Sequence, residues 1–313
     1  MFDSEQRGPG TGAHSGNSMS PAQSIRLTAL MERTSGSPDF HIGLIDGPVF
    51  TQHPDFNAAR LRGLTSPNGA TCAQNESMAC LHGTFIAGVL SARRTSPAPA
   101  LCPDCTLLLR PIFSETSAGR EHMPTATPGE LAGAILDCIH AGARVINLSV
   151  ALAQPSTRGE AMLDEALNHA LVRGVLIVAA AGNQGTLGSS AITRHPWVIP
   201  VVACDMRGRP LNESNLGGSI GRRGLSAPGD GITSLGSDGK LLSLSGTSVA
   251  VPFVTGTIAL LWSQFPSLSA TRIKLALTQG STRQRPSVVP PLLDAEAAHH
   301  LLLASPGTRR MAG

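Results

Sequence analysis

The segments RVINL (residues 144–148), EAMLDEALNHALV (160–172) and VLIVA (175–179) decide the fold class. The first and third are short apolar runs of the length expected for buried strands. The middle segment carries apolar residues at helical spacing. A strand, a helix and a second strand in this order are typical of parallel strands joined by a helix that packs on the sheet.

The same alternation continues on both sides of these segments. We expect further strands at residues 41–45, 107–112 and 198–203, and helices at 21–33, 83–93, 129–141, 248–264, 269–278 and 293–303. The pattern predicts an α/β fold with a mostly parallel central sheet and helices on both faces. In such sheets, functional sites gather at the carboxyl ends of the strands.

The sequence predicts that the folded part of the chain forms one domain. Residues 1–24 are rich in Gly, Ser and Pro and lack the apolar stretch of a secretory signal, so we expect a disordered tail and a cytoplasmic location. No linker divides residues 25–305, and we expect residues 306–313 to form a short second tail.

Composition excludes two classes of partner. The 24 basic and 21 acidic residues leave a net charge of +3, and the chain has no Tyr, two Trp and eight Phe. This is too little charge and too few aromatic rings for a nucleic-acid surface. The chain also lacks a run of 18 apolar residues, so we expect no membrane span.

Four polar residues lie where the expected strands and helices meet. Asp46 ends the first strand, and His82 opens the helix at 83–93. Ser248 begins the long helix, and Asn183 follows the strand at 175–179. Nucleophilic catalysis needs a serine, a base that takes its proton, a carboxylate that orients the base and a donor for the oxyanion. Taken singly, each of these residues could equally be a turn or cap residue.

Five motifs in order resemble those of the subtilisin-like serine protease family. They are HIGLID (41–46), HGTFIAG (82–88), INLS (146–149), AAGN (180–183) and GTSVAVP (246–252), and the resemblance extends over residues 40–304. It implies a subtilisin-like three-layer sandwich and a serine endopeptidase that uses an Asp-His-Ser triad and no cofactor.

The resemblance also implies the role of each residue. Ser248 is the nucleophile, His82 the general base and then acid, and Asp46 the residue that orients His82. Asn183 and the Ser248 backbone N–H form the oxyanion hole. The substrate adds as a strand beside Leu148, Ser149 and Val150, and the first specificity pocket is walled by Ala180, Ala181 and Gly182.

A narrower resemblance concerns the substrate. DGPV (46–49), HPDF (53–56) and a Cys before LLLRPIF (107–113) are similar to the proteases that process cyanobactins and related ribosomal peptides. Asp46 and His82 are only 36 residues apart in the sequence, which leaves little room for the insertion of the macrocyclising members. We therefore expect the partner to be a peptide or protein substrate, specifically a ribosomal precursor peptide whose leader is removed.

Other functions stay open at this point. One is a general subtilisin-like protease, and another is a peptide-binding module on the same fold without turnover. An α/β-hydrolase esterase is disfavoured for two reasons. Ala250 stands where the G-x-S-x-G motif needs its second Gly, and the order Asp46, His82, Ser248 differs from the order Ser, acid, His of that fold.

The chain departs from the family pattern at three positions and in one loop. Gly47 stands where the family usually has Ser or Thr, so a hydroxyl beside Asp46 is lost. Phe85 replaces a second histidine, and Ala151 replaces a glycine next to the substrate strand. The family's calcium loop is not recognisable, although Asp55 matches one of its calcium ligands.

The six cysteines leave their pairing open. They are Cys72, Cys80, Cys102, Cys105, Cys138 and Cys204. A four-cysteine zinc site is disfavoured, because the helix between Cys80 and Cys102 is about 16 Å long for some 11 residues. Local disulfides, either Cys72–Cys80 or Cys105–Cys138, are favoured over a zinc site. Free thiols are the default for a cytoplasmic chain, and we expect Cys204 to stay free. We expect no metal.

Overall fold

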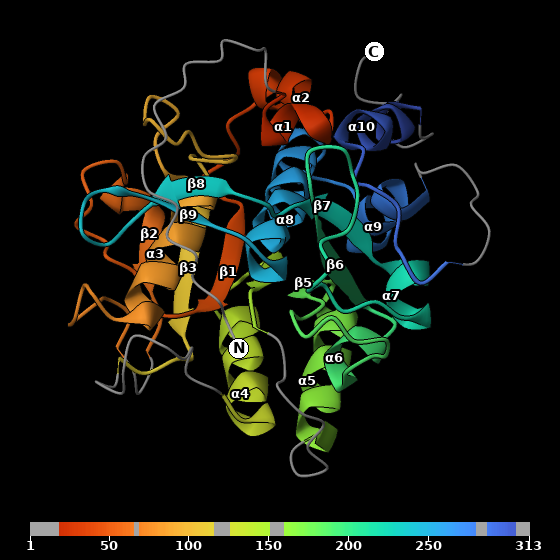
Figure 1. Cartoon of the computed structure of the whole chain (residues 1–313), viewed down its shortest axis with the longest axis horizontal. Coiled ribbons are helices and arrows are strands. Elements are labelled where there is room, and N and C mark those ends of the chain that lie inside the picture. Colours follow the sequence, from red (N-terminus) through yellow and green to blue (C-terminus); the bar gives the residue numbers. More distant parts are fainter. Residues whose placement is uncertain (1–18, 66–68, 116–125, 151–159, 280–286, 305–313) are drawn as a thin grey trace.

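The computed structural model describes residues 19–65, 69–115, 126–150, 160–279 and 287–304. In these residues a seven-stranded parallel sheet has the order β2-β3-β1-β4-β5-β6-β7 (Figure 1). Its strands are β1 (His41–Asp46), β2 (Leu61–Gly63), β3 (Thr106–Pro111), β4 (Val145–Leu148), β5 (Leu176–Ala180), β6 (Val198–Cys204) and β7 (Leu225–Pro228). A separate antiparallel pair is formed by β8 (Ile232–Leu235) and β9 (Leu241–Leu244).

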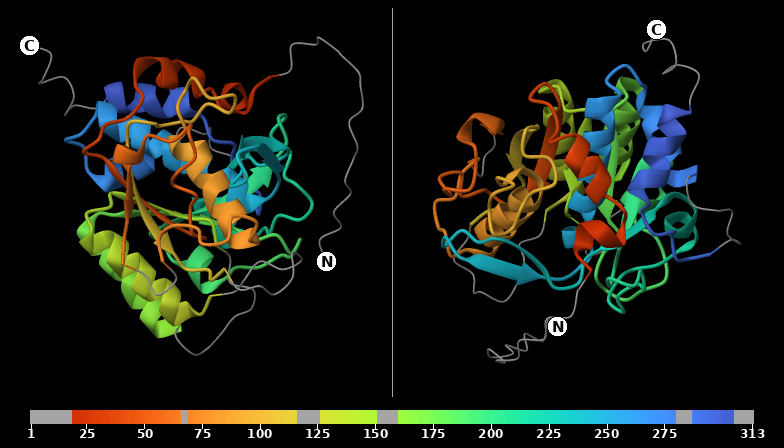
Figure 2. Two further views of the ribbon diagram at one scale, coloured as in Figure 1. Left: turned by 90° about the vertical axis from the view of Figure 1, so that its left-hand side faces the viewer. Right: turned by 90° about the horizontal axis from the view of Figure 1, so that it is seen from above.

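Helices cover both faces of the sheet, as Figure 2 shows. The helices α3 (Met78–Ser91) and α8 (Thr247–Gln264) pack on one face, and α4 (Pro128–His140) and α5 (Glu160–Arg173) pack on the other. The remaining helices are α1 (Pro21–Ser24), α2 (Thr28–Arg33), α6 (Ala191–Arg194), α7 (Gly218–Arg223), α9 (Ala270–Gln279) and α10 (Ala295–Leu303), with a 3-10 turn at Ala58–Arg60. The predicted α/β three-layer sandwich is confirmed.

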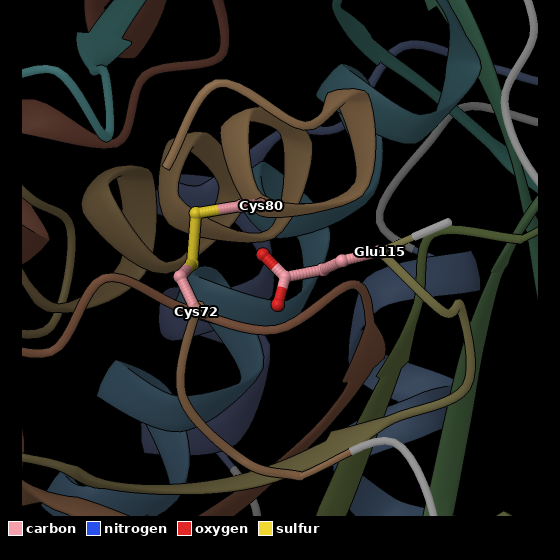
Figure 3. Close-up of side chains that lie close together, drawn as sticks. All are labelled: Cys72, Cys80 and Glu115. Atoms are coloured by element: carbon pink, nitrogen blue, oxygen red, sulfur yellow. A yellow bond between two sulfur atoms is a disulfide. The ribbon is translucent and has the colours of Figure 1, made fainter. Parts of the chain in front are cut away.

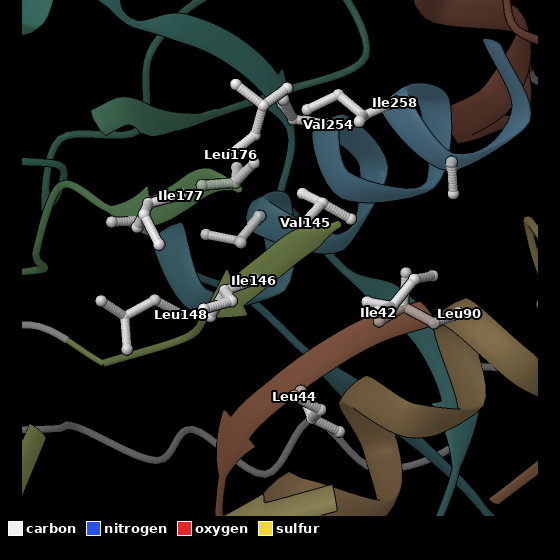
Figure 4. Close-up of a cluster of buried hydrophobic side chains, with 14 of the residues drawn as sticks. Ile42, Leu44, Leu90, Val145, Ile146, Leu148, Leu176, Ile177, Val254 and Ile258 are labelled. Atoms are coloured by element: carbon white, nitrogen blue, oxygen red, sulfur yellow. The ribbon is translucent and has the colours of Figure 1, made fainter. Parts of the chain in front are cut away.

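The core lies on both faces of the sheet, between the strands and the helices that cover them. The strands β5 and β6 are buried along their whole length, because helices cover both faces. Side chains of β1, β4 and β5 pack with Val254 and Ile258 of α8 (Figure 4). Of the helices that the structure describes, none combines the length and the apolar character needed to cross a membrane.

Two helix predictions differ from the structure. The expected helix at 21–33 is interrupted between α1 and α2, because Arg26 adopts a left-handed backbone with φ 54°. The helix expected to begin at Gly83 begins at Met78, where the Ser77 hydroxyl accepts a hydrogen bond from the Cys80 N–H. His82 therefore lies inside α3 rather than before it.

The expected terminal tails fall mostly outside the described residues. Residues 1–18 and 305–313 are not described, and α1 occupies the end of the segment expected as a tail. The short strands β2, β7, β8 and β9 were not expected from the sequence.

One cysteine prediction is confirmed and its alternative is wrong. Cys72 and Cys80 form a disulfide, whereas Cys102, Cys105, Cys138 and Cys204 are free and buried. The Cys72–Cys80 disulfide also rules out the four-cysteine zinc site and the alternative in which all six cysteines are reduced.

The backbone of α3 lies directly against the turn that follows β1. A Cβ atom on Gly83 would be 2.4 Å from the Pro48 carbonyl oxygen and 2.5 Å from that of Gly47. Both neighbours are backbone atoms that cannot rotate away. Glycine at position 83 is therefore what lets α3 approach the end of β1.

We predict that Gly83→Ala lowers the melting temperature, because the added methyl group must push α3 away from β1 at a cost of about 1–3 kcal/mol. Gly133→Ala is the matched control, because Gly133 lies in α4 and a methyl group there would meet nothing within 4 Å. That variant should gain roughly 0.5–1 kcal/mol from helix propensity. Thermal unfolding followed by circular dichroism compares the two, and equal melting temperatures would contradict the close approach.

Candidate active site

The structure brings Asp46, His82 and Ser248 into hydrogen-bonding distance. Asp46 Oδ1 lies 2.7 Å from His82 Nδ1, and His82 Nε2 lies 3.0 Å from Ser248 Oγ. Asp46 is the last residue of β1, His82 lies in the second turn of α3, and Ser248 lies in the first turn of α8. Three elements that are far apart in sequence thus meet at the carboxyl end of the sheet.

The Asp46 carboxylate is held by backbone rather than by a neighbouring hydroxyl. Its Oδ1 also accepts a hydrogen bond of 2.6 Å from the Gly47 N–H. Its Oδ2 is buried and has no partner among the described residues. A Cβ at Gly47 would lie 1.9 Å from the Ala79 carbonyl oxygen, so the approach of α3 leaves no space for a side chain here.

The hydrogen bonds of His82 set its tautomer. Nδ1 faces a carboxylate, which can only accept, so Nδ1 carries the proton and Nε2 is free to accept from the Ser248 hydroxyl. Burial lowers the pKa of His82, but the charge of Asp46 and its hydrogen bond raise it by more, so the net pKa lies above the ordinary value of 6.5. The imidazolium form is stabilised where a general base needs it.

The side chain of Asn183 has a fixed orientation. The Thr247 N–H and hydroxyl donate to its Oδ1 over 2.9 and 2.8 Å. Since an N–H can only donate, the acceptor must be the carbonyl oxygen, and Nδ2 is left as the donor. Nδ2 lies beside Gly246, whose φ is 131° and which precedes Ser248 by two residues.

The residues expected to bind substrate lie at the ends of two strands, β4 and β5. Leu148 ends β4, and Ser149 after it donates to the Ser248 carbonyl oxygen over 3.2 Å. Val150 is buried, and Ala151 lies outside the described residues.

The end of β5 also contacts the loop and helix that carry Ser248. Ala180 ends β5, and the Ala181 N–H still donates to the carbonyl oxygen of Val201 in β6. The Gly182 N–H donates to the Thr247 hydroxyl over 3.2 Å. Both expected substrate segments therefore touch the residues around the nucleophile.

Thr247 is a site residue that was not expected from the sequence. It holds both Asn183 and Gly182. Its only signal was its place between Gly246 and Ser248 in the serine motif.

One group of three candidate metal ligands lies together among the described residues, formed by Cys72, Cys80 and Glu115 (Figure 3). The two sulfur atoms are bonded to each other, and the Glu115 carboxylate accepts from the N–H groups of Ala73 and Gln74. The group therefore fastens the loop before α3 and offers no thiolate to a metal.

Asp55, which matches a calcium ligand of the family, has a protein partner in the structure. The Ser96 hydroxyl donates to its Oδ2 over 2.9 Å.

Comparison with known proteins places this geometry in a family. The subtilase family model matches residues 37–294. Among curated proteins, the chain is 32% identical to a thermostable alkaline protease of Halalkalibacterium halodurans over 64% of this chain and 52% of that protein. It is 29% identical to subtilisin DY of Bacillus licheniformis over 77% of this chain and 83% of that protein. The chain thus spans about half the length of the alkaline protease.

Solved structures give the same result. The protease domain of PatA superposes with a TM-score of 0.77 and 30% identity, covering 85% of this chain and 96% of that chain. The prenylagaramide maturation protease PagA superposes with a TM-score of 0.76 and 28% identity, covering 88% and 98%. Since the family model covers most of the chain, the protein belongs to the subtilase family of subtilisin-like serine proteases.

Proposed function

We propose that the protein is a serine endopeptidase with Asp46, His82 and Ser248 as its catalytic triad. The observation that carries the proposal is the continuous hydrogen-bonded row from the buried Asp46 through His82 to Ser248. The peptidase domain spans residues 25–305.

In the first step, Ser248 Oγ attacks the scissile carbonyl carbon and its proton passes to His82 Nε2. The negative charge that develops on the carbonyl oxygen is stabilised by Asn183 Nδ2 and the Ser248 backbone N–H. When the tetrahedral intermediate collapses, the C–N bond breaks and His82 gives its proton to the leaving amine. Water then attacks the acyl-enzyme with His82 again as base, which releases the acid product and restores Ser248.

The substrate lies between two strand ends. Its backbone pairs with Leu148, Ser149 and Val150 as an added strand. The side chain before the scissile bond packs against Ala180, Ala181 and Gly182. Because both segments contact the loop or helix of Ser248, binding aligns the scissile bond with the nucleophile.

We further propose that the substrate is a ribosomally made precursor peptide, from which the enzyme removes the leader. Two observations support this substrate class. The motifs after Asp46 resemble those of peptide-processing proteases. The structures that resemble the chain include two maturation proteases, PatA and PagA. A general subtilisin-like protease is the second candidate, supported by the similarity to subtilisin DY.

The Cys72–Cys80 disulfide favours an oxidising compartment, which weighs against the cytoplasm expected from the sequence.

We predict that Asn183→Ala lowers kcat by about 10²–10³ with little change in KM, because the lost donor acts on the transition-state oxyanion. Asn168→Ala is the matched control, since Asn168 lies in α5 and bonds to His195 away from the triad. Steady-state kinetics on one cleaved peptide measure both constants. A defect of Asn183→Ala that lies wholly in KM would contradict the oxyanion role.

The pH dependence should report on His82. The neutral imidazole is the base, so kcat/KM should rise with pH and level off above the pKa of His82 in the free enzyme. Because Asp46 raises that pKa, the midpoint should lie above 6.5. In Asp46→Asn the raising charge is gone while the burial remains, so the midpoint should move down and the rate should fall by roughly 10⁴. A wild-type midpoint below 6.5, or an unchanged midpoint in Asp46→Asn, would contradict this arrangement.

The substrate proposal predicts narrow selectivity. The purified enzyme should cleave a matching precursor peptide at one site between leader and core, and should leave unfolded casein largely intact, because selectivity follows differences in transition-state binding. Mass spectrometry of both digests gives the sites, and Ser248→Ala is the inactive control. Rapid cleavage of casein at many unrelated sites would reject the dedicated-processing role, whereas equal products from Ser248→Ala and wild type would reject the protease itself.

A further inference from the structure

A row of buried hydrogen bonds runs from the interior of α8 to the nucleophile. The Thr255 hydroxyl donates to Asn147 Oδ1 over 2.9 Å, and Asn147 Nδ2 donates to Ser149 Oγ over 2.8 Å. The Ser149 hydroxyl in turn donates to the Ser248 carbonyl oxygen over 3.2 Å. Thr255 and Asn147 are fully buried and Ser149 is 5% exposed, so water has little access to these groups.

The direction of every bond in this row follows from its last member. The Ser248 carbonyl oxygen can only accept, so the single hydrogen of Ser149 points to it. Ser149 must then accept from the amide nitrogen of Asn147, which turns Asn147 Oδ1 toward Thr255. The Thr255 hydroxyl is therefore obliged to donate, and no member can reverse without breaking a bond to the next.

The Ser248 carbonyl needs this donor because its own helix does not supply one. In an α-helix that carbonyl accepts from the N–H four residues later. Here the residue four positions later is Pro252, inside α8, which has no N–H. Ser149 provides the hydrogen bond that Pro252 cannot.

Thr255 behaves differently from the other buried threonine two residues further along α8. Thr257 donates to the Phe253 carbonyl oxygen within its own helix, as helical threonines commonly do. Thr255 instead reaches across to β4, which packs along α8 (Figure 4). The two residues match in type, helix and complete burial, and they differ in what the hydroxyl contacts.

We propose that Thr255 and Asn147 are positioning residues that fix the Ser248 peptide unit against the substrate strand through Ser149. They touch neither the substrate nor the reacting atoms. They set the orientation of the first turn of α8, and therefore the direction in which Ser248 Oγ faces His82 Nε2. They also connect that turn to the residues that follow Leu148. The inference rests on the proposed function of Ser248 as nucleophile.

The test compares Thr255→Val with Thr257→Val. Each change removes one buried hydroxyl from α8 and keeps the side-chain shape. The readout is the acylation rate with p-nitrophenyl acetate, a small ester that needs the nucleophile but no bound peptide strand. We expect Thr255→Val to lower this rate by about tenfold, a smaller loss than the roughly 10²-fold that a 1 Å misplacement can cost.

Thr257→Val should stay within about twofold of wild type, and Thr255→Ser, which restores the hydroxyl, should recover the rate. Circular dichroism at the assay temperature establishes that each variant is folded. Equal rates for folded Thr255→Val and Thr257→Val would overturn the proposal while leaving the triad intact. Ester hydrolysis by wild type no faster than by Ser248→Ala would overturn the triad and this inference together.

A second variant covers the case in which Thr255→Val does not fold. Ser149→Ala removes the last donor of the row, just after the end of β4, and leaves the interior of α8 unchanged. It should lower the acylation rate by a similar factor, and a rate equal to that of wild type would overturn the proposal.

Discussion

The hydrogen bond between Asp46 and His82 joins the end of a strand to the second turn of a helix, and the rest of the site depends on it. The two groups meet at 2.7 Å only because α3 lies in backbone contact with the turn after β1. A side chain at Gly47 or Gly83 would occupy the space of a carbonyl group. The missing hydroxyl beside Asp46 and the closeness of α3 are thus two aspects of one constraint.

The parallel sheet supplies the other half of the geometry. In its strand order β1, β4 and β5 are neighbours, and their carboxyl ends deliver the carboxylate, the expected substrate strand and the segment that leads to Asn183. The first turn of α8 enters the same edge with Ser248 at its start. The N-terminus of α8, the ends of β1, β4 and β5, and α3 meet at the site from different layers of the fold. Neither the sheet nor any single helix therefore forms the site alone.

Much of this could be predicted from the sequence, for physical reasons that also explain the failures. Buried parallel strands are continuous apolar runs, so β1, β3, β4, β5 and β6 were recognisable, whereas the short β7 (LSAP) and β8 (ITSL) carry too little pattern. The cysteine pairing stayed open because pairing depends on how loops fold back. Thr255 carried no signal, since a threonine in an apolar helix normally bonds to its own backbone, and only the neighbouring Asn147 shows that this one does not.

The central claim is that the row from Asp46 to Ser248 activates one serine, and a fluorophosphonate probe tests it most directly. Such probes react with an activated serine hydroxyl and not with an ordinary one. Mass spectrometry of the labelled, digested protein should find one adduct, on the peptide that contains Ser248, and the adduct should disappear in His82→Ala. Absence of labelling in the folded protein, or a stable adduct on another residue, would contradict the account.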